Sequence, residues 1–219
     1  FAQAVGANST AIGVDSLANS EKALAVGACS QALQSGAMAL AAYSLANGTD
    51  AIAAGYGAKA IANNAIAIGT NTLANANDAF AAGFNSLATG INSMALGSST
   101  SATADGAYAA GLLASAAGNN SVALATLASA IGSNAYALGV SSVAIGNNAA
   151  AFGTLANATG DASYAVGLFS KATETNATAF GTNATASNVN SFAIGSKATA
   201  TGLDSVALGV GSRATQNES

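Results

Sequence analysis

The ionisable side chains set narrow limits on the chemistry that this chain could perform. Among its 219 residues there are nine Asp or Glu, five Lys or Arg, one cysteine at Cys29 and no histidine. Without histidine there is no Ser-His-Asp triad, no imidazole general base and no histidine-ligated metal. A pair of carboxylates such as Asp50 and Asp78 is the remaining catalytic arrangement to weigh. Whether they converge depends on the elements that position them.

Charge and hydropathy exclude further classes. A net charge of −4 repels phosphate backbones, so we expect no nucleic-acid partner. Cys29 has no second cysteine to pair with and is expected to be structurally inert. The mean hydropathy is +0.43, but polar residues interrupt every apolar run before the 18 residues that a membrane-spanning helix needs. No basic-then-apolar signal segment is visible at the start, so if the protein is exported we expect this sequence to be a processed or excised piece.

An internal repeat runs through the whole sequence. Starting at Ala4, every seventh residue up to Ala214 is alanine, which gives 31 alanines in 31 places. The residue two positions before each of them is always Ala, Ser or Thr. A coiled coil would need large apolar residues at two positions per seven and good helix formers around them. The Gly, Asn, Ser and Thr of every repeat therefore exclude it.

The true period is fourteen, made of two unlike halves. In the fifteen halves centred on Ala11, Ala25 and onward to Ala207, 28 of the 30 residues flanking the central Ala are apolar, and 24 are Val, Ile, Leu, Met, Phe or Tyr. The other halves have 11 apolar flanks of 32. Small and large residues alternate, as in residues 205–209, and this alternation is the period of a β-strand. Gly closes 13 of the 15 apolar halves, with Ala41 and Ala125 as the departures.

Each fourteen-residue unit therefore predicts one coil of a parallel β-solenoid: strand, turn, strand, turn, with coils about 4.8 Å apart. Asn-rich pairs such as Asn63-Asn64 mark the turns. Fifteen coils would make a rod roughly 70 Å long with a thin interior of Ala, Ser and Thr. Asp50 and Asp78 would then lie two coils apart, roughly 10 Å, with Asn64 between them and no cleft, so we interpret them as solvated turn acids. A calcium solenoid needs period nine with regular Asp. We expect no enzyme activity, no cofactor and no metal.

The same geometry sends the large apolar side chains outward. Covering about 24 of them would stabilise an assembly by on the order of 40 to 70 kcal/mol per chain as an upper bound, so an obligate oligomer is predicted, with its hydrophobic core between chains. Coverage by another part of the same parent protein is the alternative. The predicted interface consists of Leu24, Val26, Met38, Leu40, Ile66, Ile68, Met94, Leu96, Val122, Leu124, Tyr136, Leu138, Tyr164, Val166, Phe192, Ile194, Val206 and Leu208. Two, three or more chains are equally compatible with this pattern.

The repeated phrase in residues 120–124, 142–146, 190–195 and 204–209, of the type Asn-Ser-Val-Ala-Ile-Gly, resembles the YadA-like head of trimeric autotransporter adhesins. The resemblance covers essentially all of residues 1–219. It implies a single all-β domain, a left-handed parallel β-roll of about 15 coils that assembles as a homotrimer. It further implies adhesion to host extracellular matrix or host cells, with possible autoaggregation, on a bacterial surface. A signal peptide, a stalk and a C-terminal outer-membrane anchor would belong to the parent protein and are not visible here.

Several polar halves also carry large apolar residues. They are Leu17, Leu33, Leu45, Ile61, Leu73, Leu87, Ile131, Val143 and Ile145. One hypothesis is an adhesive strip represented by Leu17, Leu45, Leu73 and Leu87, since solenoid faces are usual binding surfaces. The other is that these residues lie at the edge of the interface between chains. Two other functions stay open: a passive spacer that projects another domain, and an ice-binding solenoid suggested by Thr199-Ala200-Thr201.

Overall fold

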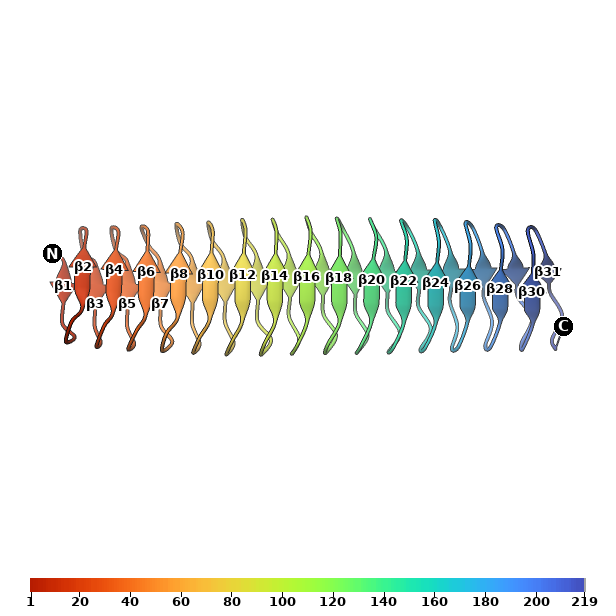
Figure 1. Cartoon of the computed structure of the whole chain (residues 1–219), viewed down its shortest axis with the longest axis horizontal. Helices are drawn as coiled ribbons and strands as arrows, with labels where there is room; N and C mark the ends of the chain where they lie inside the picture. Colours follow the sequence, from red (N-terminus) through yellow and green to blue (C-terminus); the bar gives the residue numbers. More distant parts are fainter. Residues whose placement is uncertain (219) are drawn as a thin grey trace. The chain divides into compact units, whose positions relative to one another are not determined.

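The computed structural model describes residues 1–218 and shows an all-β parallel solenoid. Within these residues there are 31 short strands and no helix, hence no helix that could cross a bilayer. The chain divides into two compact units, Phe1–Ala107 and Tyr108–Ser219. In each unit the odd-numbered strands form one parallel sheet and the even-numbered strands form a second. The predicted coil of two strands and two turns is confirmed (Figure 1).

The first unit contains strands β1 to β15. Its odd strands have two residues each and its even strands three. The odd strands are β1 (Gln3–Ala4), β3 (Leu17–Ala18), β5 (Gln31–Ala32), β7 (Leu45–Ala46), β9 (Lys59–Ala60), β11 (Leu73–Ala74), β13 (Leu87–Ala88) and β15 (Ser101–Ala102). The even strands are β2 (Thr10–Ile12), β4 (Leu24–Val26), β6 (Met38–Leu40), β8 (Ile52–Ala54), β10 (Ile66–Ile68), β12 (Phe80–Ala82) and β14 (Met94–Leu96).

The second unit repeats this design with strands β16 to β31. Its even strands are β16 (Tyr108–Ala110), β18 (Val122–Leu124), β20 (Tyr136–Leu138), β22 (Ala150–Phe152), β24 (Tyr164–Val166), β26 (Thr178–Phe180), β28 (Phe192–Ile194) and β30 (Val206–Leu208). Its odd strands are β17 (Ser115–Ala116), β19 (Ser129–Ala130), β21 (Val143–Ala144), β23 (Asn157–Ala158), β25 (Lys171–Ala172), β27 (Thr185–Ala186), β29 (Thr199–Ala200) and β31 (Arg213–Ala214).

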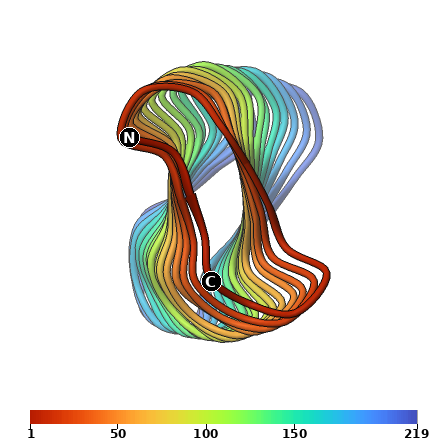
Figure 2. The same ribbon diagram turned by 90° about the vertical axis from the view of Figure 1, so that its left-hand side faces the viewer.

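Strands pair in register at an offset of one coil. Ala67 pairs with Ala81, and Leu73 pairs with Leu87, each fourteen residues further on. In the first unit, drawn from red to yellow, successive coils follow nearly the same outline when viewed along the stack (Figure 2). Equivalent residues therefore form columns, and any side chain type that recurs every fourteen residues becomes a continuous stripe.

The core of each unit consists of small side chains. From Ala18 to Ala214 every alanine of the seven-residue series is buried, whereas Ala4 and Ala11 in the first coil are not. The largest fully buried side chains are Thr72 and Thr100, followed by serines. The predicted thin interior of Ala, Ser and Thr is confirmed. One coil alone buries very little apolar surface, so stability depends on stacking.

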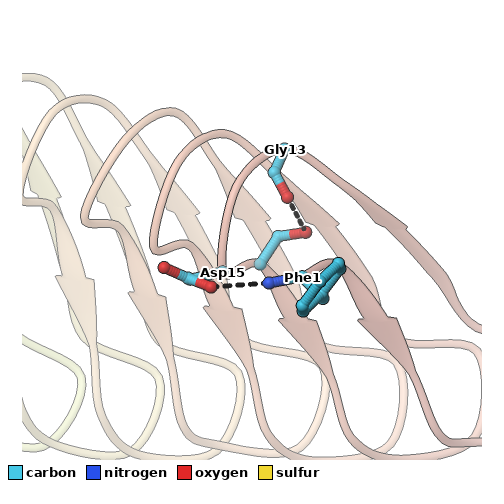
Figure 3. Close-up of polar contacts among 4 residues, drawn as sticks. Phe1, Gly13 and Asp15 are labelled. Atoms are coloured by element: carbon cyan, nitrogen blue, oxygen red, sulfur yellow. Dashed lines mark hydrogen bonds and ion pairs between the residues drawn. The ribbon is translucent and has the colours of Figure 1, made fainter.

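The turns are bonded from coil to coil as the strands are. Tyr43 donates its backbone N–H to the carbonyl of Ala28 at 2.9 Å, and Asp50 donates to Ser35 at 2.9 Å. Buried hydroxyls close the turns from inside: Ser16 donates to the Gly13 carbonyl at 3.0 Å. Figure 3 shows this turn between β2 and β3, where the terminal amine of Phe1 also contacts Asp15 at 2.7 Å. Because strands and turns share one ladder, an insertion in either would leave backbone groups unpaired.

A left-handed residue occurs once in every seven. The series of positive φ values between 52° and 68° runs from Asn8 to Glu218 without a gap. A second series, with φ between 114° and 146°, falls on the residue that closes each even strand. A Cβ on Gly13 would also lie 2.6 Å from the carbonyl oxygen of Gly27 in the next coil. Glycine thus avoids both a forbidden φ and a clash with the next coil.

Two alanines hold this glycine conformation. Ala41 has a φ of 119° and Ala125 a φ of 116°. Replacing each by glycine should relieve about 1 kcal/mol of strain, after the entropy cost of glycine is deducted. We therefore expect Ala41→Gly and Ala125→Gly each to raise the Tm in a calorimetric scan. As a control, Ala53→Gly in the middle of β8 removes a buried methyl and should lower it. A lower Tm for both turn variants would contradict the assignment of strain.

Candidate functional site

The even-strand face carries large outward side chains in nearly every coil. All eighteen residues of the predicted interface lie on even strands, beside a buried alanine, and none of them is buried within its own chain. The most exposed of them are Val206 and Leu208 on β30, with 49% and 64% of their surface accessible. The structure thus places the predicted interface residues together as two columns in each unit.

Within single coils of this face, a large side chain is often paired with a small one. Phe80 shares its strand with Ala82, Tyr108 with Ala110, and Phe180 with Thr178. On β22, as on β26, the small residue comes first, because Ala150 precedes Phe152. Ala150 lies between Tyr136 and Tyr164 in register, and a notch of about 500 Å³ opens above it.

The odd-strand face is mixed in character. The four residues of the predicted adhesive strip fall in one column of the first unit, but Gln31 separates Leu17 from Leu45 and Lys59 separates Leu45 from Leu73. Only Leu73 and Leu87 are direct neighbours. Leu33 lies two residues after Gln31, and Ile61 lies two residues after Lys59. Residues two apart in a strand point to the same side. The apolar strip is therefore staggered between two columns.

The second unit presents a more polar odd-strand face. Ile131 and Ile145 are exposed and Val143 is half-buried, but Asn157, Lys171 and Thr185 follow Val143 in its column. Thr185 and Thr199 are in register, and the ladder ends there because Lys171 and Arg213 flank them. A flat, uniform threonine surface of the kind that an ice-binding face needs does not continue beyond these two coils.

The carboxylates lie in turns and take part in amide ladders. Asn64 donates through Nδ2 to Asp78 Oδ1 at 3.0 Å, so the amide of the intervening coil separates Asp78 from Asp50, which lies two coils before it. Near the end of the second unit, Asn176 donates to Asn190 at 3.0 Å and Asn190 donates to Asp204 at 2.8 Å. Among residues 1–218 no group of three or more Cys, Asp or Glu side chains is placed to hold a metal ion. These polar groups hydrogen-bond one coil to the next rather than converging on a substrate.

The turns that follow the even strands hold a feature that sequence reasoning missed. Large apolar side chains protrude there, with between 42% and 83% of their surface accessible. They are Val14, Tyr43, Tyr56, Phe84, Leu112, Leu113, Leu127, Val140, Leu155, Leu168, Phe169 and Val210. Tyr43 and Tyr56 make an edge-to-face ring contact at 5.5 Å. In the sequence, each of these residues lies two or three positions after the second residue that flanks the central alanine of an apolar half. This fixed position was the signal that could have identified them.

Coils of two short parallel strands, with alanine inside and large apolar residues outside, define the chain as a parallel β-solenoid. A family model described as the YadA head domain repeat, in two copies, matches overlapping segments that together cover residues 4–28, 46–149, 158–198 and 200–219. The chain therefore belongs to the YadA head family, as the repeated phrase had suggested.

Comparisons with solved structures and with curated proteins add less information about the chain. The structure of the collagen-binding domain of the Yersinia adhesin YadA is similar to this chain, with 21% sequence identity and a TM-score of 0.30. That alignment covers 79% of this chain and 65% of the YadA chain, which is less than two thirds of the latter. No curated protein matches the sequence.

The amide ladder yields a stability prediction. Asn190→Ala removes one accepted and one donated side-chain hydrogen bond and places Ala at a φ of 54°. We expect a loss of about 1 to 3 kcal/mol, seen as a lower Tm. Ala162 has a φ of 52° and lies in the same column, between Asn148 and Asn176, so Ala162→Asn should have the opposite effect by extending the ladder. Equal Tm values for Asn190→Ala and the unmodified chain would refute a stabilising role of the ladder.

Proposed function

We propose that the chain is the head of a bacterial surface adhesin, which assembles as a homotrimer and attaches the cell to host extracellular matrix or host cells. A C-terminal region outside this sequence would anchor it in the outer membrane. One observation carries the proposal: the two outer faces of the solenoid differ. The even-strand face is apolar in nearly every coil, whereas the odd-strand face varies from coil to coil.

The even-strand face supports self-association. A repeating apolar surface is matched most simply by the same repeat in another copy of the chain, related by rotational symmetry. Membership of the YadA head family favours three copies.

The odd-strand face is the surface left for a target. In the first unit it offers leucines beside Gln31, Lys59 and Asn75, a mixture of apolar and polar groups typical of exposed binding surfaces. Leu17, Leu45, Leu73 and Leu87 are the residues that we propose contact matrix protein or host cells. Catalysis has no part in this proposal. Autoaggregation, if it occurs, would use the same exposed face against a second cell.

The assembly is tested by charge placed on the even-strand face. Val122→Asp with Leu124→Asp would bury two unpaired carboxylates per chain, each at a cost of several kcal/mol. We expect analytical ultracentrifugation to give three chains per particle for the unmodified protein and loss of that species for the variant. Ser115→Asp with Ser129→Asp, on odd strands of the same unit, is the matched control and should leave the trimer intact. A monomeric unmodified chain would refute the homotrimer.

Attachment is tested on the odd-strand face of the first unit. Leu45→Ser with Leu73→Ser should weaken binding of the assembled protein to its matrix protein or host cell by about tenfold, the usual effect of truncating central apolar contacts. The measurement is a binding panel of collagen, fibronectin, laminin and host cells. Val143→Ser, on an odd strand of the second unit, serves as control. Unchanged binding by an intact trimer would rule out the strip, and loss of the trimer would assign these leucines to the interface edge instead.

A further inference from the structure

The turns after five successive even strands of the second unit, β16 to β24, carry a ridge of large apolar side chains. This turn ridge consists of Leu112, Leu113, Leu127, Val140, Leu155, Leu168 and Phe169. Between 42% and 49% of each side chain is accessible. Isolated exposed leucines are ordinary on protein surfaces, but a continuous series at one edge of a stack indicates contact with something else.

Four ridge residues are held in an unfavourable backbone conformation. Leu113, Leu127, Leu155 and Phe169 have φ values between 57° and 59°. A left-handed conformation costs a bulky residue roughly 1 to 2 kcal/mol, whereas Asn and Gly accept it readily. Equivalent turns of other coils do use Asn85, Asn183 and Gly211 there. The bulky residues thus add local backbone strain. An apolar side chain that stays in water makes no contact that could compensate for this strain.

The opposite edge of the same coils has no such ridge. The turns before the even strands place Asn120, Asn134 and Asn148 at the left-handed position, and Asn134 donates to Asn148 at 3.2 Å. Apolar surface therefore continues from the even-strand face around one edge only. Phe169, for example, follows Val166 of β24 by three residues.

We propose that the turn ridge packs against a second copy of this chain and extends the even-strand interface around one edge. The ridge recurs at the coil period, so an object with the same period fits it, and the chain itself is that object. In a ring of parallel copies each contact is heterologous, with one edge of a copy meeting a different surface of the next. An apolar edge opposite a polar edge is the asymmetry that such a ring requires. This inference rests on the proposed homotrimer.

Thiol labelling of the assembled protein tests the ridge directly. In a Cys29→Ser background, Leu127→Cys gives one thiol on the ridge and Lys171→Cys gives one on the exposed odd-strand face. Serine is already present at the left-handed position of this turn at Ser99 and Ser141, so the background substitution is compatible with the fold. If a neighbouring copy covers the ridge, a maleimide should label Cys at position 127 at least about tenfold more slowly than Cys at position 171. The two rates should become equal in denaturant.

Each outcome decides the matter. Slow labelling at position 127 in a particle of three chains supports the ridge contact. Equal labelling rates in a particle of three chains overturn it while leaving the proposed assembly intact. A monomeric particle with fast labelling overturns both. Leu155→Cys provides a second ridge position, so the test does not depend on the folding of one variant.

Discussion

All other features of the chain depend on the backbone ladder that joins each coil to the next at a fixed offset of fourteen residues. The ladder includes the turns as well as the strands, since Cys29 donates to Val14 and Tyr43 donates to Ala28 in the same way that strand residues pair. An extra residue anywhere would leave buried N–H or C=O groups without partners. This accounts for a repeat that keeps its phase from Ala4 to Ala214, and for the absence of proline, which has no N–H to donate.

The ladder also determines where hydrophobic burial can occur. Two strands per coil leave room inside for alanine, serine and threonine only, and the buried residues are confined to those types and comparable small ones. The large apolar side chains therefore point outward, mostly onto the even-strand face and otherwise onto the odd-strand face and the turns. A chain that is 51% hydrophobic thus has a small-residue core of its own and keeps its larger apolar groups on its surface. Such a division is typical of a subunit rather than of a self-sufficient domain.

The coil, its period and its inward and outward residues were predictable because they follow from residue size at fixed spacing. The left-handed turns before the even strands were predictable too, since Asn, Asp and Gly at that position announce a positive φ. The turns after the even strands were not. Leu113, Leu127 and Phe169 adopt the same conformation without the residue types that signal it, because the coil-to-coil ladder overrides local preference. The stagger of the leucine strip was also missed, although the predicted fourteen-residue register already places Gln31 and Lys59 in the same column as Leu45.

Since the ladder constrains the interior and the backbone of the turns, only outward side chains are free to encode recognition. A partner whose own structure repeats at the coil spacing contacts every coil and should favour the same type of outward residue in each. The even-strand face is uniform in this way, with apolar residues in nearly every coil. A partner that contacts one place should leave the remaining coils unconstrained, and the odd-strand face changes from Leu73 and Leu87 to Lys171 and Thr185 along its column. The variation between columns thus supports the proposed assignment of the even-strand face to other copies of the chain and of the odd-strand face to a foreign target. The turn ridge, which recurs in several successive coils despite its backbone strain, follows the first pattern and not the second.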